Sequence, residues 1–511
     1  MKAHLLHRDR DFDAKAMPPR HADALSQDLE LATLIGAMAG SDRFLAEVAG
    51  AALLASLTDP EAIVYRQHVL QDCLANEDVV RGMYALALET IEAERKNYLS
   101  SVLRNPAWVL HRSVEVLQMF VASLRRLRGV AEENVTLFRS DGFRTLFRTL
   151  IEELGDDYFA AIRRHLKQLR FDRGVLISAR LGEGARGMDT VLRRPNPPEG
   201  SWIDRVFAPH APGYSFTLAD RDEAGARALS DLRDQGINLV ANALGQSTDH
   251  ILGFFTMLRT ELAFYVGCLN LRAVLRQQGA PICFPRPLGG KQRDHEASGL
   301  YDICLALTMG RGVVSNGISA RDKGLVIITG ANQGGKSTFL RSIGLAQVMM
   351  QCGMFVGAER FTADVCERIF THYKREEDTE MNSGKFDEEL RRMSDIIDQI
   401  TPGSLVLFNE SFASTNEREG SEIAREVVAA LLDRRIKVFF VSHQYEFARA
   451  FERSGRSDVL FLRAERREGG TRTFHIGEGR PEPTSHGEDL YRQIFVGLAR
   501  PAPPADTSAR A

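Results

Sequence analysis

The chain has 511 residues, which is enough for two or three domains. Hydrophobic residues make up 44% and charged residues 26%, proportions that are ordinary for a soluble globular protein whose core needs neither disulfides nor metal. The net charge of −3 is nearly neutral, so it neither requires nor excludes a nucleic-acid partner, because such binding depends on local patches of charge.

Cysteine spacing and hydropathy restrict the cellular setting. The six cysteines are scattered without a CxxC pair or a His/Cys cluster, which argues against a zinc site or a disulfide framework and favours a cytoplasmic protein. Residues 1–13 lack the apolar core of a signal peptide. The most apolar stretch, 251–268, contains Arg259 and Glu261, and a membrane span would hold each charge at a cost of roughly 3 kcal/mol. We therefore expect a buried helix there and no membrane association.

Apolar residues recur at helical spacing through residues 1–170, which predicts an all-helical first part. Two such runs are Leu31, Leu34, Ile35 and Met38, and Val114, Leu117, Val121 and Leu124. Ser113 directly precedes the second run and is a residue type that caps helix N-termini, so we expect that helix to begin there.

Between residues 171 and 225 the pattern changes to that of a small β-containing insertion. Residues 175–177 and 214–218 are strand-like, and a Pro/Gly-rich run, 194–200, lies between them. Helical periodicity then returns over residues 226–290, which end in a Pro/Gly-rich linker.

One glycine motif in the insertion imitates a nucleotide site. Residues 182–187 fit GxGxxG and follow a strand-like run. The residues after them soon meet Pro195, so the helix of a dinucleotide-binding fold cannot form. We interpret this segment as a turn or hairpin loop.

Residues 291–498 alternate short apolar runs with helix-like segments. The apolar runs span 325–329, 405–408, 436–442 and 458–462. Such alternation predicts a mostly parallel sheet covered by helices. The tail, 499–511, is rich in Pro and Ala and is expected to be disordered.

The strongest chemical signal follows the first of these apolar runs. It fits the pattern G-x-x-x-x-G-K-[ST] and opens a helix-like segment with Gly330, Ala331, Asn332, Gln333, Gly334, Gly335, Lys336, Ser337 and Thr338. Glycines let backbone N–H groups converge on phosphates, and the helix N-terminus adds partial positive charge. We expect Lys336 to reach the β- and γ-phosphates of ATP and Ser337 to offer its hydroxyl to Mg²⁺.

Two further apolar strands end in polar residues at the same edge of the predicted sheet. The strand at 404–408 leads into Asn409 and Glu410, as in a Walker B element, and Glu410 is placed to orient the attacking water. The strand at 438–442 leads into His443, which we interpret as a sensor of the γ-phosphate. Lys336, Glu410 and His443 are therefore the predicted catalytic residues of ATP hydrolysis.

Three of these segments resemble the ATPase motifs of the MutS family of DNA mismatch-repair proteins, namely TGANQGGKSTFLR at 329–341, NESFASTNEREGSEIA at 409–424 and VSHQYEFA at 441–448. The segments at 353–356, 383–384 and 484–487 add to the likeness. Residues 57–67 resemble the start of the family's helical core, or lever, domain. The resemblance covers residues 250–495 strongly and 50–130 weakly.

The resemblance implies an α+β multidomain protein, with a helical lever-like domain that carries a small β insertion, followed by an α/β ABC-type P-loop ATPase domain. It implies ATP and Mg²⁺ as cofactors, DNA as a partner, and a role in DNA repair or mismatch-repair-related transactions. Asn332 would contact the nucleotide. Ser383 and Gly384 match the family's signature loop, which reaches the γ-phosphate bound by the other subunit, so complete sites would form across a homodimer of ATPase domains.

The sequence also departs from the family's pattern. Val313 stands in place of the aromatic residue that stacks on adenine, and Asn409 in place of the Walker B aspartate. The segment after Glu410 keeps the length of the family's DELGRGTST segment but few of its glycines. Ser337 and Asn409 are the expected ligands of Mg²⁺. We expect these changes to affect the rate of hydrolysis and the binding of Mg²⁺ more than the binding of ATP.

The N-terminal part of the chain departs further from the family's pattern. The helical core begins by about residue 50, which leaves no space before it for the family's mismatch-reading domain, and the clamp domain is reduced to 171–225. We therefore expect a short form of the family without mismatch specificity.

Basic residues of the helical half could contact DNA phosphates. Alternatively they form an ordinary solvated helix face, because acidic residues lie among them. These basic residues are Arg125, Arg126, Arg128, Arg139, Arg144, Arg148, Arg163, Arg164, Lys167, Arg170 and Arg173. A nucleotide-gated protein scaffold and a weakly hydrolysing ATP sensor remain as alternatives.

Overall fold

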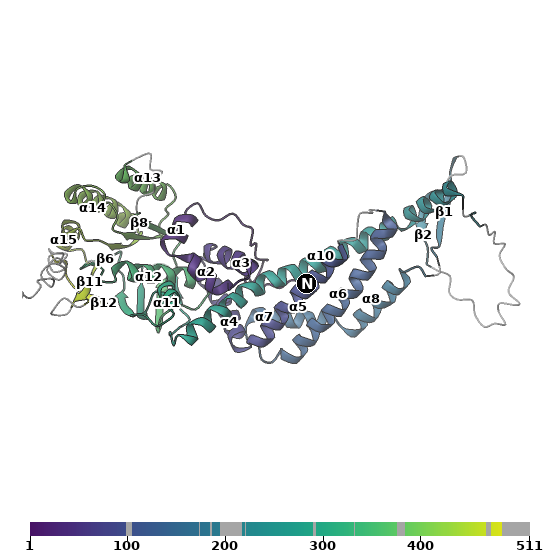
Figure 1. Cartoon of the computed structure of the whole chain (residues 1–511), viewed down its shortest axis with the longest axis horizontal. Helices are drawn as coiled ribbons and strands as arrows, with labels where there is room; N and C mark the ends of the chain where they lie inside the picture. The colour runs from purple at the N-terminus through teal and green to yellow at the C-terminus, as the bar shows by residue number, and fades with distance from the viewer. Residues whose placement is uncertain are drawn as a thin grey trace, which may run out of the picture. The chain divides into compact units, whose positions relative to one another are not determined.

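A computed structural model of the chain describes residues 1–98, 105–172, 174–183, 187–194, 217–219, 221–289, 293–331, 333–375, 384–466 and 472–482. The chain forms two compact units (Figure 1). The first unit consists of Met1–His4 and Asn76–Leu262, and the second of Leu5–Ala75 and Ala263–Ala511.

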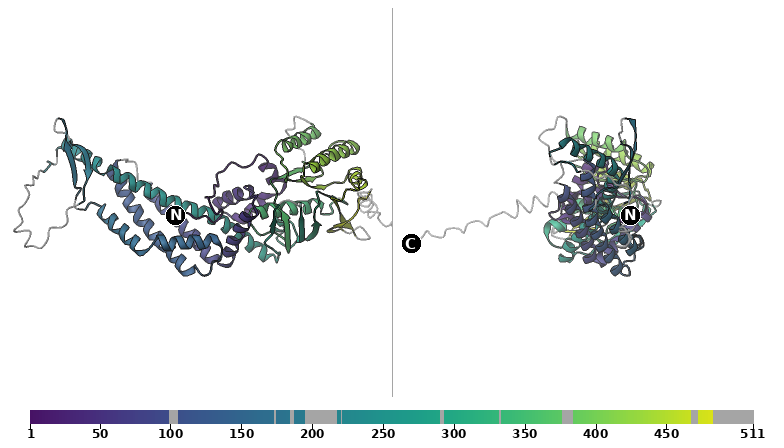
Figure 2. Two further views of the ribbon diagram at one scale, coloured as in Figure 1. Left: turned by 180° about the vertical axis from the view of Figure 1, so that it is seen from behind. Right: turned by 90° about the vertical axis from the view of Figure 1, so that its right-hand side faces the viewer.

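The first unit is a helical bundle. Its helices are α5 (Glu77–Tyr98), α6 (Pro106–Asn134), α7 (Asp141–Glu153), α8 (Asp156–Gln168) and the first part of α10 (Glu223–Gln277). Helix α6 packs against α5, α7 and α8. It also runs beside α10, where the rings of Phe120 and Phe255 lie 6.1 Å apart (Figures 1 and 2). The bundle is held by buried apolar faces of the kind that the helical periodicity predicts.

Helix α6 begins earlier than predicted. Asn105, not Ser113, caps it, because the side chain of Asn105 accepts a hydrogen bond from the backbone N–H of Trp108 at 2.9 Å and Pro106 occupies the first helical position. Ser113 is a buried residue inside the helix. The predicted apolar run on α6 is buried, as is the run on α2 apart from the half-buried Ile35.

The insertion begins with a two-stranded hairpin. Strands β1 (Ile177–Leu181) and β2 (Gly187–Leu192) pair antiparallel, with Leu181 opposite Gly187, so the GxGxxG segment falls between the two strands of a hairpin; its residues 184–186 lie outside the described residues. The hairpin packs on α10, since a Cβ atom on Gly236 would lie 2.6 Å from the side chain of Ile177. The predicted strand at 214–218 lies largely outside the described residues.

The second unit contains a six-stranded sheet with the order β12-β11-β6-β10-β9-β8. Its strands are β6 (Leu325–Thr329), β8 (Ile369–Tyr373), β9 (Leu405–Asn409), β10 (Lys437–Val441), β11 (Val459–Arg466) and β12 (Arg472–Glu478). All neighbours pair in parallel except β11 and β12. The predicted parallel sheet is therefore confirmed, and its four predicted strands are β6, β9, β10 and β11.

Helices cover both faces of this sheet. One face packs on α13 (Lys385–Ile397), α14 (Glu417–Asp433) and α15 (Tyr445–Arg453) in a core that includes Phe408, Phe440 and Phe447. Helix α12 (Lys336–Gln351) packs against β9 and β10. Alternate side chains of a strand point to opposite faces of the sheet, and helices cover both faces here. The fully buried strands β6 and β10 are therefore apolar at nearly every position.

A second sheet of four strands, which the sequence did not indicate, has the order β3-β7-β4-β5. Its strands are β3 (Arg286–Leu288), β4 (His295–Leu300), β5 (Asn316–Ala320) and β7 (Arg360–Asp364), and α11 (Ile303–Met309) connects β4 to β5. Strands β4 and β5 are only half buried, so their apolar residues form no continuous run.

The first helices of the chain belong to the second unit. These are α1 (Ala22–Asp28), α2 (Leu31–Ala39), α3 (Arg43–Leu54) and α4 (Pro60–Ala75). Helix α1 contacts β8, α2 contacts α11, and α3 contacts α12. Helical periodicity predicts one helical domain over residues 1–170, whereas the compact units join Leu5–Ala75 to the C-terminal half. Helical periodicity identifies each buried face but not the distant element that covers it.

Helix α10 is the one helix among the described residues that is long and apolar enough to cross a membrane by composition. Its most apolar window of 18 residues has a mean hydropathy of 1.3, and 67% of that window is buried inside the structure. Glu261 of this helix is fully buried. This burial is typical of a core helix.

Candidate nucleotide-binding site

The glycine-rich loop connects the end of β6 to the start of α12. Gly330 and Gly335 have φ angles of +113° and +88°, a region that glycine adopts without strain. A Cβ atom on Gly330 would lie 3.0 Å from the backbone nitrogen of Ala464, and one on Gly334 would lie 2.9 Å from the carbonyl of Ala331. The loop therefore needs glycine for both conformation and space. Asn332, predicted to contact nucleotide, lies outside the described residues.

Lys336, the first residue of α12, folds back over the loop. Its Nζ donates hydrogen bonds to the carbonyl oxygens of Gly330 at 2.9 Å and Ala331 at 3.0 Å. Burial lowers the pKa of Lys336, and the nearby carboxylate of Glu410 acts in the opposite direction. The loop thus holds a buried ammonium group against carbonyl oxygens, which are weaker partners than phosphate oxygens.

Ser337 and Asn409 meet at the edge of the sheet. The hydroxyl of Ser337 donates a hydrogen bond to Oδ1 of Asn409 at 2.9 Å. Two neutral oxygen ligands from the P-loop and from the end of β9 are suitable for Mg²⁺, which prefers oxygen and keeps several of its own waters. These two residues fit a magnesium ion that a bound triphosphate would share.

Glu410 and His443 lie at the ends of the neighbouring strands β9 and β10. His443 Nδ1 and Glu410 Oε1 are 3.8 Å apart, and the interaction with His443 lowers the pKa of Glu410. Lys336 and Lys374 lower it further, against the opposing effect of partial burial. Glu410 is therefore an ionised carboxylate at neutral pH, as an acceptor for a proton of water must be.

A cavity of about 510 Å³ brings most of the predicted site together. The predicted residues that line it are Val313, Gln333, Gly334, Gly335, Lys336, Ser337, Thr338 and Glu410. Gly330, Ala331, Asn409 and His443 adjoin the cavity through the hydrogen bonds and the ion pair described above. Gly384 precedes the first residue of α13 and is not among the lining residues, and Ser383 lies outside the described residues.

Part of the cavity lining is apolar, and the lining includes an aromatic residue that the sequence did not indicate. Leu305, Met309 and Val313 form the apolar part of the lining. Phe474 from β12, which is 46% exposed, also lines the cavity and lies beside Gly335 of the P-loop, where a Cβ atom would be 3.6 Å from its side chain. The Oδ1 of Asn316 accepts a hydrogen bond from the N–H of Ile476 at 2.7 Å, which ties β12 to this wall. No local signal marks Phe474, because only the antiparallel pairing of β12 with β11 brings it to the P-loop.

Two protein-family models match the chain. The model described as MutS2 N-terminal domain matches residues 58–278, and the model described as MutS domain V matches residues 326–487. The second match contains the P-loop, Asn409, Glu410 and His443. The chain belongs to the MutS family.

Individual relatives agree with this assignment. The chain is similar to "MutS protein homolog 4" of Mus musculus, with 29% identity over 49% of the chain and 25% of that protein. It is 31% identical to "DNA mismatch repair protein MutS" of Thermotoga neapolitana over 36% of the chain and 23% of that protein. "Endonuclease MutS2" of Thermus thermophilus is 33% identical over 23% of the chain and 16% of that protein. The chain thus spans a quarter or less of the length of these MutS relatives.

Residues 1–57 of this MutS-family chain precede the first family match. All of them are described, and the regular structure that they form is helical. These helices pack within the second unit, and Leu29 fits against Gly344 of α12, where a Cβ atom would lie 2.6 Å from the leucine side chain. No separate mismatch-reading domain is formed by these described residues.

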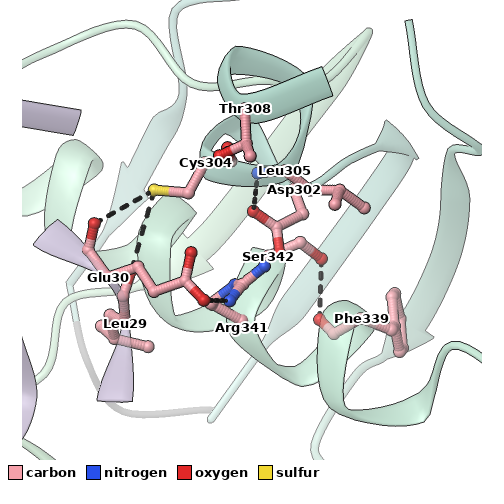
Figure 3. A network of polar contacts seen from close by, with 9 residues as sticks. All are labelled: Leu29, Glu30, Asp302, Cys304, Leu305, Thr308, Phe339, Arg341 and Ser342. Carbon is pink, nitrogen blue, oxygen red and sulfur yellow. Dashed lines mark hydrogen bonds and ion pairs between the residues drawn. The ribbon is translucent and has the colours of Figure 1, made fainter. Parts of the chain in front are cut away.

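An ion-pair network supports the wall of the MutS-family nucleotide cavity (Figure 3). Arg341 of α12 donates to Asp302 through Nε at 2.6 Å and also pairs with Glu30 at the start of α2. Asp302 lines the cavity, is buried, and caps α11 by accepting from the N–H of Leu305 at 3.0 Å. Figure 3 shows the Arg341 side chain between the two carboxylates, so α2, α11 and the P-loop helix share one cation.

Replacing Arg341 with Met is expected to destabilise the second unit by about 3 kcal/mol, because it leaves the Asp302 carboxylate buried without a counter-ion. Glu30→Gln, which removes the more exposed partner, is expected to cost under about 1 kcal/mol. Urea-unfolding midpoints of the two variants measure this difference. Equal midpoints would contradict the proposed importance of the buried pair.

The Arg341→Met penalty also has an expected pH dependence. Burial raises the pKa of Asp302, and Arg341 opposes that rise. Without Arg341 the folded-state pKa rises further, so the folded state takes up a proton more readily than the unfolded state as the pH falls. The penalty is therefore expected to shrink as the pH is lowered through the raised pKa of Asp302.

Proposed function

We propose that this chain is a cytoplasmic ATPase that works as a homodimeric, DNA-binding switch in DNA repair or mismatch-repair-related transactions. The observation that carries the proposal is the convergence of Lys336, Ser337 and Glu410 on one cavity at the carboxyl edge of a parallel sheet. Nucleotide sites of open α/β folds lie at this edge.

The proposed ligand is ATP with Mg²⁺. The backbone N–H groups of the P-loop and the N-terminus of α12 would hold the phosphates, and Lys336 would exchange its two carbonyl partners for phosphate oxygens. The apolar residues of the lining, Leu305, Met309 and Val313, would contact the adenine base, and Phe474 would provide an aromatic ring in the cavity that Val313 does not. Ser337 and Asn409 would hold Mg²⁺, which when bound neutralises charge on the β- and γ-phosphates.

The proposed reaction is in-line attack of water on the γ-phosphate. Glu410 would orient that water and accept its proton, and His443, beside Glu410, would sense the γ-phosphate. Asn409 supplies no negative charge, so we expect slow turnover compared with a relative that has aspartate at this position. This property also supports the alternative that the chain is an ATP sensor with little hydrolysis.

The proposed dimer would complete each site in trans. Gly384 stands at the start of α13, and Ser383 and Gly384 match the signature loop that reaches the γ-phosphate of the opposing subunit in the family that this chain resembles. In this scheme residues 291–498 form the ATPase domain, with a tail at 499–511 that lies outside the described residues. Residues 1–170 and 226–290 form the lever-like part, except that Leu5–Ala75 and the residues from Ala263 onward pack with the ATPase half, and 171–225 form the reduced clamp-like insertion.

The DNA-binding proposal rests on the helical unit. Several predicted basic residues are neutralised within it: Arg126 pairs with Glu89 at 3.0 Å, and Arg128 pairs with Glu132 and Asp156 at 2.8 Å. Exposed basic side chains remain on α7 and α8, namely Arg144, Arg148, Arg163, Arg164 and Lys167. These are the candidates for phosphate contacts.

Fluorescence anisotropy of a labelled duplex tests this proposal. In the presence of ATP, we expect the affinity for the duplex to fall steeply as the salt concentration rises. The slope of log binding constant against log salt concentration is expected to become shallower by about 0.9 for each phosphate-contacting arginine that is replaced by Gln. Arg144→Gln and Arg163→Gln are the test variants, and Arg126→Gln, which removes an already paired arginine, is the matched control. A mismatch is expected to change affinity less than tenfold, about 1.4 kcal/mol. Nucleotide turnover without any duplex binding would favour the scaffold alternative.

A further inference from the structure

The turn that carries Glu410 has an unusual backbone for its residue types. Glu410 and Phe412 have φ angles of +54° and +59°, a left-handed conformation that costs a non-glycine residue roughly 1–2 kcal/mol. Phe412 stands where the DELGRGTST segment of the resembling family has its first glycine. The chain thus keeps a glycine-like backbone with a bulky residue, and other contacts must hold it.

A buried histidine lies directly against this turn. His372 of β8 is fully buried, and its Nδ1 lies 2.7 Å from the hydroxyl of Ser411, the residue between Glu410 and Phe412. The imidazole ring stacks on the Phe412 ring with a centroid separation of 5.4 Å and an interplanar angle of 21°. Its Nε2 lies 3.0 Å from the backbone carbonyl oxygen of Glu389 on α13.

The partners of His372 fix its protonation state. The Glu389 carbonyl oxygen can only accept, so Nε2 carries a hydrogen and donates it. Burial, with smaller contributions from nearby charges, lowers the pKa of His372 to about 4, so the ring is neutral at neutral pH and Nδ1 is an acceptor. The Ser411 hydroxyl has one hydrogen to donate and two acceptors within reach, Nδ1 of His372 at 2.7 Å and the backbone carbonyl oxygen of His372 at 2.5 Å, so both of its contacts are with His372.

The turn is fixed from the other side as well. Gln444, which follows His443, donates from Nε2 to the carbonyl oxygen of Phe412 at 3.1 Å. Glu410 itself donates its backbone N–H to the Val441 carbonyl at 2.9 Å. The Glu410 backbone therefore lies between the end of β10 and the His372–Ser411 pair, and a loss of either contact would let the carboxylate move.

We propose that His372 and Ser411 are positioning residues for ATP hydrolysis, which hold Glu410 in the nucleotide cavity and connect it to α13. This role rests on the proposed ATPase function. The link to α13 matters because that helix begins directly after Gly384, which belongs to the loop proposed to reach the other subunit. Movement of α13 upon dimer closure would pass through Glu389 and His372 to the turn that carries Glu410.

Steady-state ATPase assays and ATP-binding calorimetry on Ser411→Ala and His372→Phe test the proposal. Both variants are expected to lower kcat at least tenfold while the Kd for ATP changes less than about twofold, because neither residue lines the cavity. His372→Asn places an amide oxygen near the position of Nδ1 and is expected to recover much of the lost kcat. Ser404→Ala, the same substitution at a buried serine before the opposite end of β9, is the control and is expected to keep wild-type kcat.

The outcomes separate this role from the ATPase proposal. If the wild type hydrolyses ATP and both variants have a kcat within twofold of it, the positioning role alone is overturned. Wild-type protein that binds ATP without turnover would overturn the proposed hydrolysis and this role with it. An equal loss in Ser404→Ala would identify a general packing effect and also overturn the proposal. Nitrogen-15 spectra of labelled histidine provide a readout independent of turnover, with a neutral Nε2–H form expected for His372 and a shifted Nδ1 signal in Ser411→Ala.

Discussion

Replacing Lys336 with Ala is expected to weaken ATP binding by about ten- to a hundredfold or more, because charge-assisted hydrogen bonds to phosphate contribute roughly 1.5–3 kcal/mol each and Lys336 is placed to make at least one. Lys336→Met, which keeps most of the apolar stem, is expected to lose affinity to the same extent. Isothermal titration calorimetry with ATP and Mg²⁺ measures both.

Lys336→Met is not expected to destabilise the protein in the absence of nucleotide. Burial lowers the pKa of Lys336, so at neutral pH the charged ammonium group opposes folding, and its removal relieves that cost. Thermal unfolding should therefore give a similar Tm for wild type and Lys336→Met without ATP, whereas only the wild type gains stability when ATP is added. An unchanged Kd in the variants would contradict the assignment of Lys336.

Replacing Glu410 with Gln is expected to leave ATP binding intact and to slow hydrolysis by about 10²–10⁴-fold, the usual contribution of a positioned general base. The amide keeps the size of the side chain but cannot accept a proton from water. Single-turnover assays measure the rate. Glu422→Gln, an exposed acid of α14 that does not line the cavity, is the matched control and is expected to turn over as the wild type does.

Glu410→Gln is also expected to trap the proposed dimer. If ATP closes two ATPase domains and hydrolysis reopens them, a variant that binds without hydrolysis accumulates in the closed state. Light scattering at micromolar protein should then report twice the monomer mass with ATP and Mg²⁺. A variant that binds ATP and remains monomeric would remove the main support for sites shared between subunits.

The sequence predicted that the P-loop, Glu410 and His443 lie at one edge of a sheet, but it did not indicate the residues that form the walls of the cavity. The P-loop, Glu410 and His443 follow apolar strands directly, so a local pattern identifies both the residue and the sheet edge at which it lies. Phe474, Asp302 and Arg341 come from elements that meet only in three dimensions. Residues 1–75 show the same limit, because amphipathic periodicity predicts a buried face without naming its partner.

The sequence shows a departure from the MutS pattern where one residue type replaces another, as at Asn409 and Val313. It does not show a new contact between distant residues that compensates for such a replacement. The shortage of glycines after Glu410 was evident in the sequence. The contact that accompanies it, between His372 and Ser411, joins residues 39 positions apart and has no local signature. Long-range hydrogen bonds between buried side chains depend on register, which only the parallel pairing of β8 with β9 fixes.

The packing of Leu5–Ala75 against the C-terminal half has a consequence for biosynthesis. These residues leave the ribosome well before Ala263 and the strands that follow it, since the whole helical unit is made in between. At 5–20 residues per second, the interval from Ala75 to the completed β6 strand is roughly 10–50 s. During that time the apolar faces of α1, α2 and α3 have no β8, α11 or α12 to cover them. The nascent chain is therefore expected to depend on chaperones that shield helical apolar surface, and to aggregate when synthesis stalls inside the helical unit.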